Sequence, residues 1–221
     1  MTKVWDPSIR IFHWATVMLL AGLWYTGEQG GDLIYLHQTF GFVLVALILY
    51  RIIWGFWGSR YARFKEFVKG PGAILSYLPT MFKRSGGDHH LSHNPLGGIA
   101  VLVILGLILA QLVTGMMSTD DIMFDGPFVS QVSSDVSDTA MFLHHVIFSI
   151  LQAVVVIHVA AVVWHQRFKG EPLIQSMIHG RKPYDGENVR FSIVKSIIVI
   201  ALAAGISQFV IRFFGEVSSA F

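Results

Sequence analysis

Five long stretches of this sequence contain almost no charged side chains, which limits the chain to a membrane-spanning fold. A helix needs roughly 20 apolar residues to cross the hydrocarbon core of a bilayer. The candidate spans are Ile11–Tyr25, Leu33–Trp54, Gly97–Met117, Met141–Trp164 and Phe191–Phe214. The composition agrees, since only 14% of the residues are charged, against roughly a quarter in an average soluble domain. We therefore expect an all-α integral membrane protein.

The distribution of Lys and Arg predicts how the chain is oriented. If the five helices alternate in direction, all of the 16 Lys and Arg residues except Arg212 lie on the side of the N-terminus. The opposite side holds an acidic connection at residues 118–140. Basic residues collect on the cytoplasmic side of membrane proteins, so we expect a cytoplasmic N-terminus and an outer C-terminus.

The chain contains no cysteine, which removes several kinds of cofactor site. Disulfides, iron–sulfur clusters, thiolate zinc sites and covalently attached haem all require cysteine. A metal must therefore be held by histidine, methionine or carboxylate side chains, or arrive within a cofactor. The ten histidines are consequently the most informative polar residues.

Four histidines lie inside the predicted spans and form two layers of depth. His13 in the first span and His158 in the fourth lie near the cytoplasmic ends, whereas His37 in the second and His144 in the fourth lie near the outer ends. His144 and His158 are close to four helical turns apart, about 21 Å, and so project from nearly the same face. His145 points to a different face, which favours His144 as the ligand.

Two imidazoles from facing helices can supply both axial ligands of a haem iron, whereas zinc normally takes three or four ligands. We therefore expect two non-covalent haem b groups, an inner one on His13 and His158 and an outer one on His37 and His144. The simpler alternative is that each histidine is buried alone and hydrogen-bonded to nearby backbone. His165, on the same face as His158, is a second candidate for the inner ligand.

Glycines and arginines near these layers are weaker candidates for haem contacts. Gly41 lies four residues after His37 on the same helix face, where a missing side chain leaves room for a flat macrocycle. Three other glycines offer similar room, or close helix packing instead: Gly22, Gly106 and Gly115. Arginines near the inner layer could pair with haem propionates; they are Arg10, Arg51, Arg60 and Arg63.

Two further segments are expected to be peripheral. His89, His90 and His93 form a cluster that we expect to be a solvated polar loop rather than a metal site. After Pro172, the segment Leu173–His179 is predicted to form a short helix on the membrane surface.

Several motifs resemble the bacterial cytochrome b561 and nickel–iron hydrogenase b-type cytochrome family. They are VWDPSIRIFHW at residues 4–14, RIIWG at 51–55, GSRYARF at 58–64, HNPLGG at 93–98 and MIHGRK at 177–182. The resemblance covers roughly residues 4–183.

The resemblance implies a four-helix transmembrane diheme core over residues 1–190, in the bacterial inner membrane. Residues 191–221 add a fifth helix that ends in the periplasm. Such proteins pass electrons between quinone and a redox partner, such as a periplasmic cytochrome or a dehydrogenase or hydrogenase subunit. His13, His37, His144 and His158 stand where the family carries its axial ligands. Lipid and quinone are the other expected partners, and no nucleic acid is expected.

Two other functions compete with that of an electron carrier. A self-contained quinone-linked oxidoreductase, of the superoxide oxidase type, needs the same two haems, so the sequence does not decide whether the chain is itself an enzyme. A histidine-based proton or metal transporter is disfavoured, because no Pro, Asp or Glu lies within the five spans.

Overall fold

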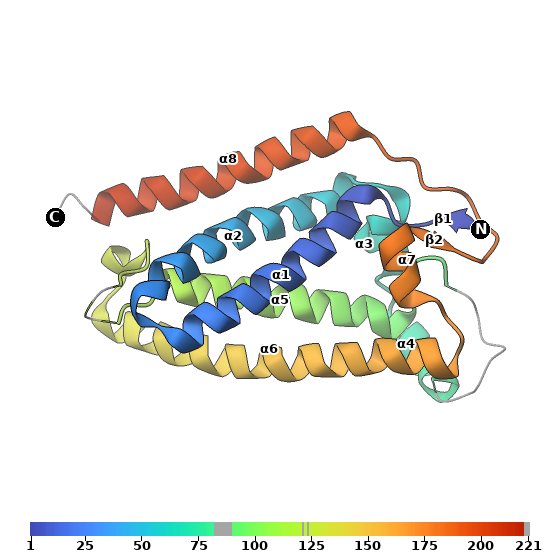
Figure 1. Cartoon of the computed structure of the whole chain (residues 1–221), viewed down its shortest axis with the longest axis horizontal. Coiled ribbons are helices and arrows are strands. Elements are labelled where there is room, and N and C mark those ends of the chain that lie inside the picture. Colours follow the sequence, from blue (N-terminus) through green and yellow to red (C-terminus); the bar gives the residue numbers. More distant parts are fainter. Residues whose placement is uncertain (82–89, 121, 123, 219–221) are drawn as a thin grey trace. The chain divides into compact units, whose positions relative to one another are not determined.

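The computed structural model describes residues 1–81, 90–120, 122 and 124–218, and helices dominate it. Five helices within these residues are long (Figure 1). They are α1 (Pro7–Gln29), α2 (Ile34–Trp57), α5 (Pro95–Met116), α6 (Ser134–Phe168) and α8 (Ile193–Ser218). Each predicted span corresponds to one of these helices, which confirms the expected all-α architecture.

Short helices connect the long ones. They are η1 (Gly31–Leu33), η2 (Arg60–Ala62), α3 (Phe64–Phe67), α4 (Pro71–Tyr77), η3 (Leu78–Thr80), η4 (Val129–Gln131) and α7 (Leu173–His179). The bounds of α7 are those predicted for the short helix after Pro172.

Among the described residues, four helical segments are long and apolar enough to cross a membrane. They are Gly31–Trp57, Pro95–Met116, Ser134–Phe168 and Ile193–Phe213. The 23 residues of α1 give a length of about 34 Å, which exceeds a hydrocarbon core of about 30 Å. Helix α1 is less apolar because it carries Arg10, His13 and Glu28. The chain is therefore a multi-pass membrane protein, and a crossing by α1 stays a prediction.

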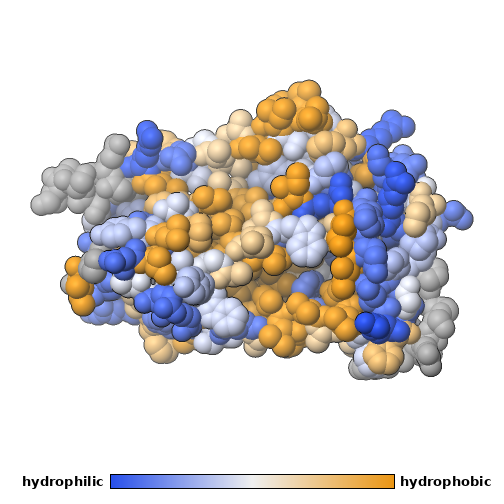
Figure 2. Space-filling model, viewed as in Figure 1, coloured by the Kyte–Doolittle hydropathy of each residue, from blue (hydrophilic) through white to orange (hydrophobic). Residues whose placement is uncertain are grey.

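Large apolar side chains remain exposed on the long helices (Figure 2). On α6, Val156 and Ile157 are 68% and 66% exposed. Helix α8 buries a narrow stripe that includes Val199, Ala203 and Ser207 and exposes apolar residues elsewhere. Such a surface is stable where lipid chains, rather than water, surround the helices.

The chain forms two compact units, and the boundary between them falls inside every long helix. The first unit contains Met1–His13, Arg51–Ile104 and Val154–Ile198, and the second contains Trp14–Tyr50, Leu105–Ala153 and Val199–Phe221. His13 and His158 lie in the first unit, whereas His37 and His144 lie in the second. The predicted domain boundary at residue 190 stays a prediction.

A buried carboxylate organises the start of α1 in the first unit. Asp6 is 1% exposed, and its Oδ1 accepts hydrogen bonds from Ser8 Oγ at 2.5 Å and Ile9 N at 3.0 Å. Its Oδ2 accepts from Trp54 Nε1 at 3.2 Å and from Ser59 Oγ. Asp6 thus caps the N-terminus of α1 and ties it to the end of α2.

A small sheet holds the N-terminus against the segment after α7. Strand β1 (Thr2–Lys3) pairs antiparallel with β2 (Arg181–Lys182). Gly180 ends α7 in the left-handed conformation, with φ 78°, and a side chain there would lie 2.6 Å from the Trp5 carbonyl oxygen. Glycine therefore suits this position both in backbone conformation and in space.

Lys182, in strand β2, makes the free energy of unfolding depend on pH. Its ammonium is buried and donates to the carbonyl oxygens of His90 at 2.9 Å and Ser92 at 3.0 Å. Burial lowers the pKa of Lys182 to about 8, against about 10.4 in an unfolded chain. Between these values the unfolded state binds more protons, so stability rises as pH rises through this window.

We expect Lys182→Met to remove this contribution to the pH dependence. The measurement is the Tm of the detergent-solubilised protein between pH 7.5 and 10, with the exposed Lys65→Met as the matched control. Lys182→Met should flatten the rise in Tm, and Lys65→Met should leave it as in the parent protein. Equal slopes in all three proteins would contradict the prediction.

Candidate metal centre

His37 on α2 and His144 on α6 face each other in the second unit. Their ring centroids are 6.3 Å apart and the ring planes are inclined by 73°. Metal–imidazole bonds measure about 2.0–2.1 Å, so rings bound on opposite sides of one metal ion have centres about 6–6.5 Å apart. The observed separation therefore suits two axial ligands of a single iron.

The neighbouring helix α1 fixes which nitrogen of His37 is protonated. His37 Nδ1 lies 3.0 Å from the carbonyl oxygen of Leu23 and 3.2 Å from Thr26 Oγ1. A carbonyl oxygen can only accept, so Nδ1 carries the hydrogen. The Nε2 atom of a neutral ring then has a free lone pair, which is the form that binds a metal.

His144 is held in the same way by α5. Its Nδ1 lies 3.0 Å from the carbonyl oxygen of Gln111 and 3.3 Å from Thr114 Oγ1. Both rings therefore use Nδ1 for the protein and keep Nε2 for a ligand. Metal-binding histidines usually donate their second nitrogen to a carbonyl or carboxylate in this manner.

Glycine follows threonine at both contacts and lies directly against the ring. A Cβ on Gly115 would lie 2.8 Å from His144 Cε1, and one on Gly27 would lie 3.1 Å from His37 Cε1. Gly115 was expected to leave room for a macrocycle, but in the structure it lies against the His144 ring instead. A Cβ on Gly41 would meet no described atom within 4 Å, so the space at this glycine, four residues after His37, is open.

Sequence reasoning missed these threonine–glycine pairs. The signal was present as LWYTG at residues 23–27 and QLVTG at residues 111–115, each near the outer end of a predicted span. Each pair contacts a histidine that lies on another helix, so neither pair is close in sequence to the histidine that it contacts.

The structure distinguishes the two adjacent histidines of α6. His145 is exposed, and its ring centroid lies 6.3 Å from that of His144 at an angle of 83°. His144 is half-buried and faces His37. The choice of His144 rather than His145 as the ligand stays a prediction.

The other predicted pair lies in the first unit. His13 on α1 and His158 on α6 are both half-buried. His165, the second candidate for the inner ligand, is buried and lies 3.3 Å from Glu171. Its Nδ1 is therefore engaged by a carboxylate from the segment that follows α6.

His93 is not in a solvated loop, and that expectation is wrong. Its ring packs against Trp5 at 5.0 Å and Phe67 at 4.6 Å between centroids. Burial, with the nearby charges of Arg51 and Lys182, lowers the pKa of His93 to about 3. The aromatic partners come from distant segments, so the polar local sequence did not reveal the packing. His89 lies outside the described residues.

The candidate propionate-binding arginines differ in their surroundings. Arg51 is 4% exposed, with its guanidinium 4.9 Å from the centre of the Phe64 ring. Arg60 is exposed and pairs with two glutamates, of which Glu187 is 2.6 Å away. Arg63, just before α3, is half-buried.

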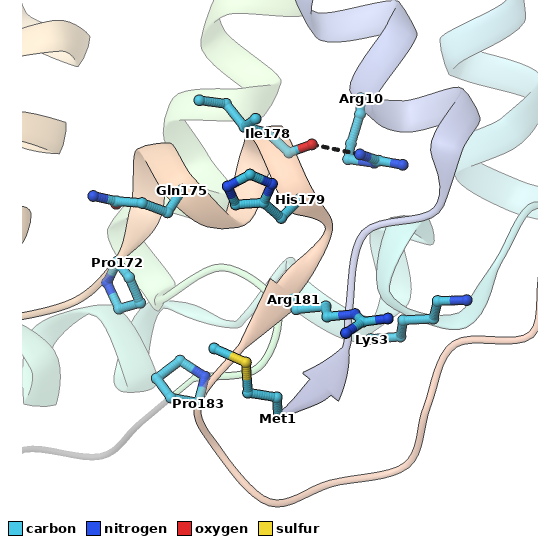
Figure 3. Close-up of a pocket in the computed structure, with 9 residues that line it drawn as sticks. All are labelled: Met1, Lys3, Arg10, Pro172, Gln175, Ile178, His179, Arg181 and Pro183. Atoms are coloured by element: carbon cyan, nitrogen blue, oxygen red, sulfur yellow. Dashed lines mark hydrogen bonds between the residues drawn. The ribbon is translucent and has the colours of Figure 1, made fainter.

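Arg10 lines a cavity of about 800 Å³ in the first unit, beside α7 and β2 (Figure 3). Lys3 and Arg181 also line it, and Arg10 Nη1 donates to the Ile178 carbonyl oxygen at 2.5 Å. None of the four predicted ligand histidines is among the described residues that line this cavity.

Comparison with known proteins identifies a family. A model of the prokaryotic cytochrome b561 family matches residues 4–180. Relatives include the probable Ni/Fe-hydrogenase 1 B-type cytochrome subunits of Escherichia coli strain K12 and Escherichia coli O157:H7, each 27% identical over 137 residues. Each match covers 51% of this chain and 57% of the relative, so the chain spans little more than half their length. No solved structure matches the chain.

The family match covers most of the chain and includes His13, His37, His144 and His158. Membership implies haem b and electron transfer in a membrane, which agrees with the apolar helices and the facing imidazoles. The chain therefore belongs to the prokaryotic cytochrome b561 family.

Proposed function

We propose that this protein is a diheme b-type cytochrome that carries electrons across the bacterial inner membrane between quinone and a redox partner. The facing pair His37 and His144 carries the proposal, because both Nδ1 atoms are engaged by the protein and both Nε2 atoms are left for iron. His13 and His158 would hold the second haem in the first unit.

Haem supplies one-electron oxidation and reduction when it is bound. The four histidines would hold the two haems, two histidines to each iron, which suits electron transfer rather than oxygen binding. The open space at Gly41 would admit a flat cofactor, and Arg51, a buried cation, would pair with a propionate. Arg10, Arg60 and Arg63 are the other arginines proposed for the propionates; Arg10 also donates to the Ile178 carbonyl oxygen and Arg60 pairs with Glu187.

The N-terminus would face the cytoplasm and the C-terminus the periplasm, since Lys and Arg gather on one side of the predicted topology. The similarity to hydrogenase cytochrome subunits supports a redox partner such as a hydrogenase or dehydrogenase subunit, or a periplasmic cytochrome.

Reconstitution into vesicles that enclose ferricyanide tests this function. Quinol added outside should reduce the enclosed ferricyanide, and the rate should fall to that of protein-free vesicles in His37→Ala and His158→Ala. Haem reduction by quinol without reduction of the enclosed acceptor would contradict transmembrane transfer. Catalytic reduction of quinone by superoxide with the purified chain alone would instead identify a self-contained oxidoreductase.

A further inference from the structure

We propose that Thr26 with Gly27, and Thr114 with Gly115, are matched positioning elements that set the orientation and electron-donating strength of His37 and His144. The inference rests on the proposed function, since it takes these two histidines as ligands of one haem. It assigns roles to α1 and α5, which would supply no ligand to that iron.

The two elements have the same construction. In each, one backbone carbonyl accepts from the histidine Nδ1–H, the threonine hydroxyl three residues later lies beside the same nitrogen, and glycine follows. The Nδ1–carbonyl distance is 3.0 Å in both, and the Nδ1–hydroxyl distances are 3.2 Å to Thr26 and 3.3 Å to Thr114. A separation of three residues is about one helical turn, which brings the carbonyl and hydroxyl together.

Each hydroxyl presents a lone pair to the imidazole. Thr26 Oγ1 donates its own hydrogen to the Gly22 carbonyl at 2.8 Å, and Thr114 Oγ1 donates to the Ala110 carbonyl at 2.9 Å. The Nδ1–H is therefore shared between two acceptors. Partial withdrawal of this proton makes the ring a stronger donor at Nε2, which favours oxidised iron.

The glycines set how closely the His37 ring approaches α1 and the His144 ring approaches α5. At the distances given above, a Cβ on Gly115 would require His144 to shift, and one on Gly27 would crowd His37 less severely. Since alanine normally favours a helix over glycine, any loss on substitution here reports the ring contact. A threonine–glycine pair contacts a histidine ring on α1 and again on α5, and the two rings face each other. This repetition distinguishes the contacts from ordinary helix packing.

Redox titration of the purified holoprotein, with electron paramagnetic resonance of the oxidised haems, tests the threonines. Thr26→Val and Thr114→Val should each shift the midpoint potential of one and the same haem to a more positive value, and the double variant should shift it further. The other haem should keep its potential. Thr26→Ser and Thr114→Ser should restore the parent value, because serine retains the hydroxyl.

The matched control is Thr39→Val, since Thr39 bonds to the Tyr35 carbonyl on the exposed face of α2. It should leave both potentials unchanged. Threonine-to-valine variants that retain both haems with unchanged potentials and resonance spectra would overturn the inference while leaving the proposed function intact.

Haem content tests the glycines. Gly115→Ala should lose the haem of the second unit, Gly27→Ala should lose less of it, and Gly205→Ala on α8, where a Cβ meets no described atom within 4 Å, should keep it. The retained haem of the first unit reports that the protein is folded. Full haem content with an unchanged spectrum in Gly115→Ala would overturn this role, and a parent protein without haem would overturn the proposed function as well.

Discussion

His144→Ala is expected to lower the haem content from about two groups per chain to about one. The imidazole of His144 faces His37 at 6.3 Å between ring centroids, and its Nδ1 is held by α5. Loss of one axial ligand should release the non-covalent haem during purification. The measurement is haem per chain by pyridine haemochrome, with size-exclusion elution as the test of folding.

His145→Ala provides the adjacent control, because that ring is exposed on another face of α6. It should retain both haems. The double variant His37→Ala/His144→Ala should lose no more haem than either single variant, whereas His144→Ala/His158→Ala should lose both groups. Loss of a haem in His145→Ala but not in His144→Ala would contradict the assignment.

Asp6→Ala is expected to lower the free energy of unfolding by several kcal/mol, since a buried donor left without an acceptor costs about 1–3 kcal/mol and a lost helix cap about 0.5–2 kcal/mol. The carboxylate accepts hydrogen bonds from Ser8, Ile9, Trp54 and Ser59. Removing it leaves several buried donors without an acceptor and uncaps α1. Asp6→Asn retains one acceptor oxygen and should cost less.

Thermal unfolding of the detergent-solubilised protein measures this effect. The matched control is Asp138→Ala, since Asp138 is exposed on α6. Asp6→Ala should lower Tm by many degrees, and Asp138→Ala should change it little. A Tm for Asp6→Ala equal to that of the control would contradict a structural role for the buried carboxylate.

The helices could be predicted because their physics is local. Long apolar runs identify the spans, and helical periodicity places His144 and His158 on one face and separates His144 from His145. The ends are less predictable: α6 extends well beyond Met141–Trp164, to Ser134 and Phe168. Asp135 in its first turn and Arg167 in its last suit the helix dipole and support this extension.

Contacts between distant segments could not be predicted. His93 follows polar residues, yet its neighbours Trp5 and Phe67 come from the N-terminus and α3. The contacts that Thr26 and Thr114 make with histidines likewise depend on which helices adjoin. The sequence predicts the periodicity of each helix, but it does not predict how that helix is rotated about its axis relative to its neighbours.

The most direct test of the central claim is a reduced-minus-oxidised visible spectrum of the purified protein with haem quantified per chain. We expect a b-type spectrum and about two haem b groups per chain, because the proposed function assigns one haem to His37 with His144 and another to His13 with His158. Protein made with adequate haem supply that nevertheless contains no haem would contradict the electron-carrier function and favour a histidine-based transporter.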